Sequence, residues 1–97
     1  MEKIRFSIIV PVLHESDTIN SLIEHLERSE WDAGHEIIVA DGSPDRDTIQ
    51  AIGSEKVIKI LAAKGRARQM NAGASIAKGE ILIFLHADTK LPHNALT

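Results

Sequence analysis

The sequence lacks cysteine and has very few aromatic residues, and both absences exclude kinds of site. Without cysteine the chain forms no disulfide and has neither a thiolate metal ligand nor a cysteine nucleophile. Aromatic residues make up only 3% of the 97 residues, which leaves few flat side chains on which bases or sugars could stack. Positive charge is not in excess either, since the net charge is −3. Nucleic acid is therefore not expected as a partner.

Long apolar runs are also missing. The longest, residues 6–13 and 81–85, are far too short to span a bilayer. No basic segment precedes a long apolar stretch, so no signal peptide is predicted, and a cytoplasmic location is the expectation. The composition is that of an ordinary globular protein, and the length allows one domain at most.

Four apolar segments alternate with three segments of helical character. The predicted strands span residues 4–13, 35–41, 56–61 and 80–88, and the predicted helices lie within residues 15–31, 42–54 and 64–80. Residues 56–61 alternate between polar and apolar positions, whereas the other strands are continuously apolar, which indicates burial on both faces. This order predicts an α/β fold with a mostly parallel, Rossmann-like sheet and helices on both faces.

The helices carry further signals for their buried faces and ends. Apolar residues recur at helical spacing in the first helix: Ile19, Leu22, Ile23 and Leu26. The third helix is expected to bury one face and to end at Gly79; that face consists of Ala67, Met70, Ala74 and Ala77. The expected N-caps are Ser16 or Asp17 for the first helix and Asp45 or Asp47 for the second. Residues 91–97 resemble the start of another helix, so the chain is expected to be a fragment of a longer protein.

Charged and polar residues follow the predicted strands. Ligands of open parallel sheets bind beyond the carboxyl ends of the strands, where these residues should gather. The residues at that edge are Pro11, Val12 and Glu15 after the first strand, Asp41 after the second, Lys64, Gly65, Arg66 and Arg68 at the third crossover, and His86 and Asp88 after the fourth.

The common glycine-rich phosphate loops are absent. Neither GxGxxG nor GxxxxGK[ST] occurs, and the first loop, PVLHESDT, contains no glycine. A bound phosphate would therefore need a cation. His86 and Asp88, two residues apart on an extended chain, point to the same side and could hold Mn²⁺ or Mg²⁺ while leaving positions for diphosphate oxygens. The basic segment KGRAR would add guanidinium groups for the same anion.

Three segments resemble the amino-terminal half of the family 2 glycosyltransferases in order and spacing: SIIVPVLHES, EIIVADGSPD and GRARQMNAGASIAKGEILIFLHADTKLP. Those enzymes have the GT-A fold and use a metal-bound nucleoside diphosphate sugar as donor. The ending FLHADT, with HADT in place of the DxD motif, is similar to a bacterial subgroup. The resemblance implies that Pro11, Val12 and Glu15 line the nucleoside pocket. It further implies that Asp41 recognises the base, Arg66 approaches the base or the diphosphate, and Asp88 holds the metal.

Two positions depart from the family pattern. Ala40 replaces the first acid of the usual DDGS, and His86 replaces the first acid of DxD, which leaves the affinity for a metal and the choice of metal open. The resemblance places acceptor binding and the catalytic base in a later half. Residues 1–97 are therefore expected to form one nucleotide-sugar-binding subdomain, truncated before the acceptor half and inactive alone. No catalytic residue is assigned.

Each candidate also has an ordinary structural alternative. Asp41 and Asp88 could cap turns, Glu15 could be a first-turn acid, His86 could be hydrogen-bonded at a strand end, and either Arg66 or Arg68 could be a solvated surface residue. His14 has no partner at a useful spacing and is left unassigned. The rival functions are a non-catalytic nucleotide-binding or regulatory domain and a nucleotidyltransferase. The acceptor, the sugar, membrane association of the parent protein and self-association through a sheet edge remain open.

Overall fold

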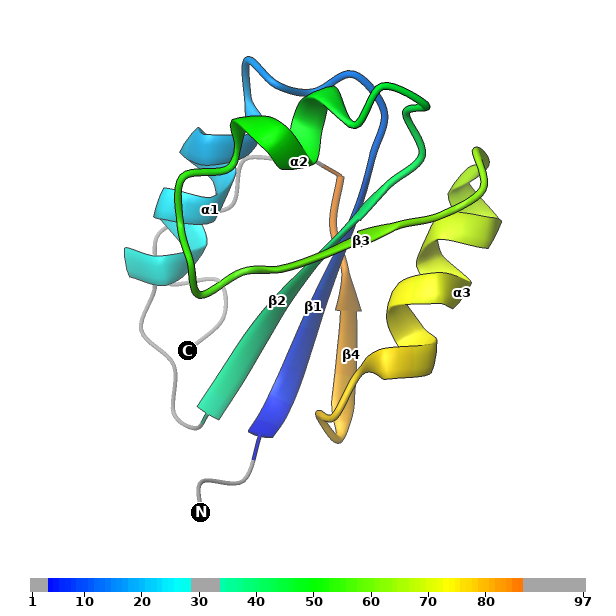
Figure 1. Cartoon of the computed structure of the whole chain (residues 1–97). Helices are drawn as coiled ribbons and strands as arrows, with labels where there is room; N and C mark the ends of the chain where they lie inside the picture. Colours follow the sequence, from blue (N-terminus) through cyan, green and yellow to red (C-terminus); the bar gives the residue numbers. More distant parts are fainter. Residues whose placement is uncertain (1–3, 29–33, 87–97) are drawn as a thin grey trace.

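The computed structural model describes residues 4–28 and 34–86, which form a parallel sheet in the order β3-β2-β1-β4. The strands are β1 (Ile4–Val12), β2 (Gly34–Asp41), β3 (Ile58–Leu61) and β4 (Ile81–Phe84). All three pairs of neighbouring strands run parallel, so their carboxyl ends meet at one edge (Figure 1). This edge is where the sequence predicts a ligand.

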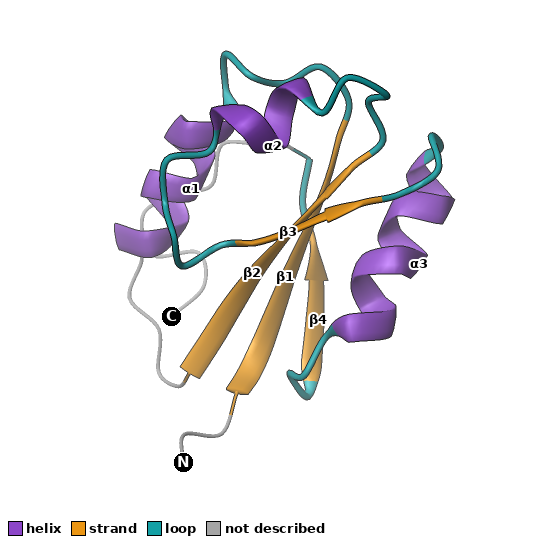
Figure 2. Cartoon of the chain, viewed as in Figure 1, coloured by secondary structure: helices purple, strands orange, loops and turns teal. Residues whose placement is uncertain are grey.

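Helices cover both faces of the sheet. They are α1 (Ile19–Arg28), α2 (Asp47–Ala51) and α3 (Arg66–Ile76). Figure 2 shows α1 and α2 on one side of the sheet and α3 on the other. The predicted α/β fold, with a parallel sheet between helices, is confirmed. No helix in residues 4–28 and 34–86 is long and apolar enough to cross a membrane.

The main core lies between the sheet and α1 with α2. Its members alternate along the strands and recur at helical spacing on α1: Ile8, Val10 and Val12 from β1, Ile37 and Val39 from β2, and Ile19, Leu22, Ile23 and Leu26 from α1. Successive residues of a strand point to opposite faces, so Ile9 and Ile38 point away from this core and are equally buried. Burial on both sides explains why β1 and β2 are continuously apolar.

The contact between α3 and the sheet differs from the prediction. The buried residues of α3 are Gln69 and Gly73, whereas the predicted face, Ala67 included, is exposed or half-buried. Gly73 has no side chain, which lets the helix backbone approach Ile9 so closely that an added Cβ would lie 2.5 Å from Cγ2. The apolar pattern of an alanine-rich helix is weak, and for this reason spacing did not identify its buried face. The buried positions are occupied by a glycine and a hydrogen-bonded amide.

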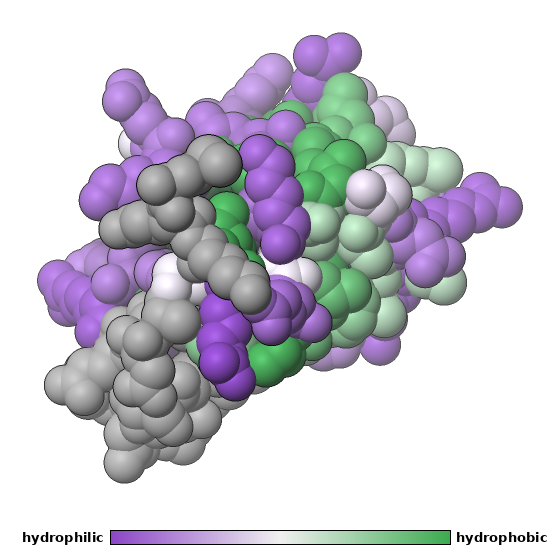
Figure 3. Space-filling view, turned by 90° about the horizontal axis from the view of Figure 1, so that it is seen from below, coloured by the Kyte–Doolittle hydropathy of each residue, from purple (hydrophilic) through white to green (hydrophobic). Residues whose placement is uncertain are grey.

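Strand β4 is at the edge of the described sheet and is not fully buried. It pairs with β1 alone among the described strands, and Ile81, Leu82 and Phe84 are each 40–42% exposed. The expectation of burial on both faces is therefore wrong for β4. Figure 3, which views the molecule from below, shows hydrophobic residues at the surface beside hydrophilic ones. The strand ends at Phe84, and the predicted continuation to residue 88 lies partly outside the described residues.

Helix ends differ from the predictions by one to three residues. Helix α1 begins at Ile19, so Ser16 and Asp17 lie in the turn before it. Helix α2 begins at Asp47, whose backbone N–H donates to the Asp45 carboxylate at 3.3 Å. Helix α3 ends at Ile76 rather than next to Gly79. After α3, the backbone N–H groups of Lys78 and Gly79 donate to the side chains of Glu36 and Ser7, contacts with other segments that local sequence does not show.

Candidate functional site

A cavity of about 300 Å³ lies at the carboxyl edge of the sheet. The residues that line it come from the end of β1 and the loop after it, from the loop before α3 and the start of α3, and from the segment after β4: Pro11, Val12, Leu13, Glu15, Lys64, Gly65, Arg66, Gln69 and His86. The lining thus contains five residues that the sequence singles out for binding: Pro11, Val12, Glu15, Arg66 and His86. Their roles toward a ligand stay predictions, but their convergence on one cavity is a property of the fold.

The cations of the third crossover are not equivalent. Lys64 and Arg66 line the cavity and are exposed, so they can reach a ligand without giving up a buried ion pair. Arg68 lies on the same helix and is exposed as well, but it does not line the cavity. The expectation that one of the two arginines belongs to the solvated surface fits this placement.

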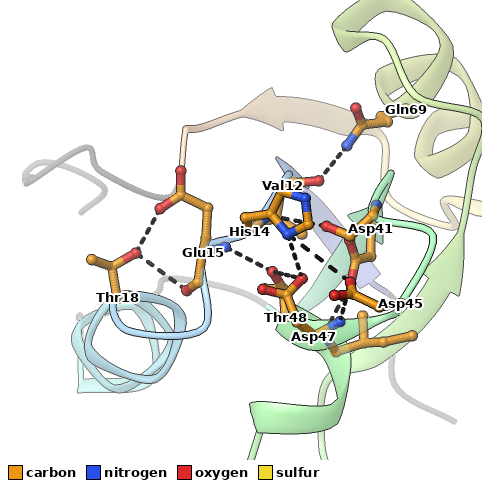
Figure 4. A network of polar contacts seen from close by, with 11 residues as sticks. Val12, His14, Glu15, Thr18, Asp41, Asp45, Asp47, Thr48 and Gln69 are labelled. Carbon is orange, nitrogen blue, oxygen red and sulfur yellow. Dashed lines mark hydrogen bonds and ion pairs between the residues drawn. The ribbon is translucent and has the colours of Figure 1, made fainter.

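Asp41 lies beneath the edge rather than in the cavity lining. Its side chain is fully buried, and its carboxylate accepts hydrogen bonds from the backbone N–H groups of Ser43 at 2.8 Å and Ile49 at 3.2 Å (Figure 4). Asp41 thereby connects the end of β2 to the turn and to α2, which is the structural alternative that the sequence left open. Recognition of a base by Asp41 stays a prediction.

The loops after β1 and β2 are hydrogen-bonded to each other. The His14 backbone N–H donates to the Ser43 hydroxyl at 2.9 Å, and the Glu15 backbone N–H donates to the Thr48 hydroxyl at 2.8 Å. The Glu15 carboxylate accepts a hydrogen bond from Thr18 at 2.9 Å (Figure 4). These bonds fix the backbone that carries Glu15 to the cavity.

His14 finds two partners that sequence spacing did not show. Its Nδ1 lies 3.3 Å from an Asp47 carboxylate oxygen and 4.0 Å from one of Asp45. Burial raises the pKa of Asp47, but hydrogen bonds from Ser43 and His14, together with the charge of His14, act the other way and leave the pKa below its ordinary value. Among the described residues, this is the one group of three or more side chains with metal-ligand geometry. His14 follows β1, whereas Asp45 and Asp47 follow β2, so only the fold brings them together.

Gln69 is a buried polar residue of the cavity lining that the sequence did not single out. Its side chain is 4% exposed and hydrogen-bonds to the ends of β1 and β2 and to the loop before α3. A glutamine in the first turns of an alanine-rich helix carries no sequence signal for such a role. Asp88, the predicted metal ligand, lies outside the described residues, whereas His86 is exposed beside the cavity.

Comparison with known proteins identifies the family. The model of glycosyl transferase family 2 matches residues 7–97. The chain belongs to glycosyl transferase family 2. The resemblance stated from the sequence is thereby confirmed at the level of the family, while the subgroup with HADT stays a prediction. The comparison with curated proteins finds no match.

A solved structure supports the fold of this family 2 chain. The crystal structure of S. aureus TarS matches with a TM-score of 0.74 and 22% sequence identity, over 96% of this chain and 18% of that chain. At this identity the likeness shows the fold. The chain spans less than a fifth of TarS, so the activity of a whole enzyme is a matter for proposal.

Proposed function

We propose that residues 1–97 are the donor-binding part of a glycosyltransferase and that the cavity binds the nucleoside diphosphate of a sugar donor. The observation that carries this proposal is the convergence of Glu15, Arg66 and His86 on one cavity at the carboxyl edge, in a chain of glycosyl transferase family 2. Family membership supports glycosyl transfer. The geometry supports a binding role for these particular residues.

The cavity has different chemistry on its two sides. Pro11 and Val12 offer backbone and apolar surface, which suits a nucleoside. Lys64 and Arg66 are exposed cations on the other side, which suits a diphosphate because a guanidinium group can donate two parallel hydrogen bonds to phosphate oxygens. The proposed ligand therefore lies with its base toward the end of β1 and its diphosphate toward the start of α3.

The cavity lining offers donor types that suit a divalent metal. The lining contains one imidazole, His86, and one carboxylate, Glu15, and both are donor types that Mn²⁺ accepts. Asp88 is the further ligand that the sequence predicts. A bound Mn²⁺ or Mg²⁺ would neutralise charge on the diphosphate leaving group. The protein's own part is to hold the diphosphate with cations and to provide an incomplete ligand set that leaves room for phosphate oxygens.

The acceptor site and the catalytic base are proposed to lie in a part of the parent protein outside this chain. Residues 1–97 alone would then bind a donor without transferring the sugar. A non-catalytic nucleotide-binding domain of the same fold is the alternative. Such a domain would bind nucleotide independently of metal, and its parent protein would transfer no sugar.

Titration of the protein with UDP, GDP, CDP, ADP and dTDP, with and without Mn²⁺, tests the proposal. We expect one or more of these to bind in a Mn²⁺-dependent manner. Arg66→Ala should weaken binding about 10- to 100-fold, because a charge-assisted hydrogen bond contributes about 1.5–3 kcal/mol. Asp88→Ala should abolish the dependence on Mn²⁺.

Arg68→Ala is the matched control, since Arg68 lies on the same helix, is exposed and does not line the cavity. Equal weakening by Arg66→Ala and Arg68→Ala would show that general surface charge, rather than the cavity, binds the anion. Binding that is independent of Mn²⁺ would favour the non-catalytic domain. Absence of binding with every diphosphate, in the parent protein as well, would refute the proposal.

A further inference from the structure

The side chain of Gln69 is a buried amide whose hydrogen-bonding groups are almost fully used. It is 4% exposed and shares the buried side of α3 with Gly73. A primary amide has two N–H donors and one acceptor oxygen with two lone pairs. Burial of such a group is costly unless it finds partners, so its contacts carry structural information.

Both amide donors bind to the sheet. Nε2 donates to the carbonyl oxygen of Val12 at 2.7 Å and to that of Ala40 at 2.9 Å. Val12 is the last residue of β1 and Ala40 is the last but one of β2, and the two strands pair in parallel. The Gln69 amide therefore fixes the two central strands relative to each other at the edge where the cavity begins.

The amide oxygen binds the loop before α3. Oε1 accepts the backbone N–H of Gly65 at 3.2 Å, and Gly65 directly precedes the cavity cation Arg66. Gly65 has φ of 135°, a conformation that side chains rarely permit, so the loop depends on glycine at this position. The amide has one orientation, because rotating it by 180° would point donors at the Gly65 N–H and the oxygen at the two carbonyls.

A second glycine makes space for this amide. An added Cβ on Gly42 would lie 2.7 Å from Oε1 and 2.8 Å from Cδ of Gln69. Distances below 3.0 Å force a shift, and here the atoms that would have to move are hydrogen-bonded to Val12, Ala40 and Gly65. Gly42, Gly65 and Gln69 together form what we name the amide clamp.

We infer that Gln69 is a positioning residue for the nucleotide: the amide clamp sets the distance between the side of the cavity formed by Val12 and the side that carries Lys64 and Arg66. This inference rests on the proposed function. A nucleoside diphosphate would be held by the cations while its nucleoside lies on the Val12 side. Its affinity should therefore depend on this distance. A nucleoside without phosphates contacts only the Val12 side and should be much less sensitive.

The test compares Gln69→Met with Glu36→Met. Methionine keeps the length of either side chain and removes its hydrogen bonds. Glu36 is also a buried group that connects separate segments, through bonds of 2.6 Å from the Ser7 hydroxyl and the Lys78 backbone N–H, but it lies at the opposite end of the sheet. Both variants should lose stability. If Gln69 positions the nucleotide, the affinity of the folded protein for the nucleotide should change in Gln69→Met and not in Glu36→Met.

Dissociation constants are measured with the tightest-binding nucleoside diphosphate plus Mn²⁺, and with the matching nucleoside, well below both melting temperatures. For Gln69→Met we expect diphosphate affinity to fall about tenfold or more, which corresponds to about 1.4 kcal/mol, and nucleoside affinity to change about twofold at most. Gly42→Ala, which displaces the unaltered amide, should reproduce this pattern. Glu36→Met should leave both constants unchanged.

Three outcomes would overturn the inference: unchanged diphosphate affinity in folded Gln69→Met, equal losses in Gln69→Met and Glu36→Met, or equal losses for nucleoside and diphosphate. Amide hydrogen exchange adds a measurement that needs no ligand, because the Gly65 N–H should exchange faster in Gln69→Met and in Gly42→Ala. If the unaltered protein binds no nucleoside diphosphate, the proposed function fails. Unchanged exchange at Gly65 would then also overturn the clamp, and faster exchange would support it as a purely structural device.

Discussion

Replacement of Gly73 by alanine tests how closely α3 packs on the sheet. An alanine Cβ would lie 2.5 Å from Cγ2 and 3.3 Å from Cγ1 of Ile9, which is fully buried in β1. Ile9 is β-branched and enclosed, so it has little freedom to move. Excess volume in a packed interior costs about 1–3 kcal/mol, and the short contact places this variant in the upper part of that range.

An opposing effect must be subtracted. Alanine is more favourable than glycine inside a helix by about 0.8–1.0 kcal/mol. For Gly73→Ala we therefore expect a net loss of about 1–2 kcal/mol in the free energy of unfolding. In a domain of this size each kcal/mol lowers the melting temperature by about 4–8 °C. Urea denaturation followed by far-ultraviolet circular dichroism measures the loss.

Two further variants separate the effect of the contact with Ile9 from the general effect of replacing a glycine by alanine. Gly53→Ala adds the same methyl group where no atom lies within 4 Å, so it should be neutral or stabilise by up to about 1 kcal/mol. Ile9→Ala removes Cγ1 and Cγ2, the two atoms that the new Cβ would approach too closely, and leaves the Ile9 Cβ at an ordinary contact distance of 3.5 Å. In that background Gly73→Ala should become stabilising, because only the helix preference remains. If Gly73→Ala stabilises the unaltered protein, the close packing of α3 on β1 is refuted.

Three other perturbations have expected outcomes. Asp41→Asn weakens two hydrogen bonds from backbone N–H groups and should cost about 1.5–3 kcal/mol in urea denaturation, whereas a change below about 0.5 kcal/mol would contradict its structural role. Ser7→Ala removes a buried hydroxyl that donates to Glu36 at 2.6 Å, and we expect the free energy of unfolding in urea to fall by about 1–3 kcal/mol. An unchanged midpoint of the urea transition would count against this bond. Burial lowers the pKa of His35, so the unfolded state binds a proton more readily and stability falls as the pH drops below the ordinary value of 6.5. His35→Gln should reduce this change of stability with pH, measured by thermal melts between about pH 7 and pH 5. If the melting temperature of the variant changes with pH as much as that of the unaltered protein, other groups cause the effect.

Much of the site's location followed from residue order alone. Parallel strands place their carboxyl ends together, so residues that follow different strands were expected at one edge, and Glu15, Arg66 and His86 do line one cavity. The position of Asp41 could not be obtained in this way. Its place after β2 was evident, but its burial depends on backbone N–H groups of the next turn and of α2.

Apolar periodicity was enough to predict the strands, the helices and the buried face of α1, because it reports local geometry directly. Ile19, Leu22, Ile23 and Leu26 were identified by spacing, and all four are buried. Such spacing works where one element has a strong apolar face. It does not work for α3, whose apolar residues are mostly alanines and whose close approach to β1 requires a glycine.

The contacts between polar groups, in contrast, depend on how the folded chain brings distant segments together. Gln69 reaches Val12 and Ala40 across 57 and 29 positions of the chain, and His14 meets Asp47 from a different loop. A hydrogen bond depends on distances of about 3 Å and on direction, and neither is encoded in the spacing of one segment. Both are fixed once the sheet places the ends of its strands side by side.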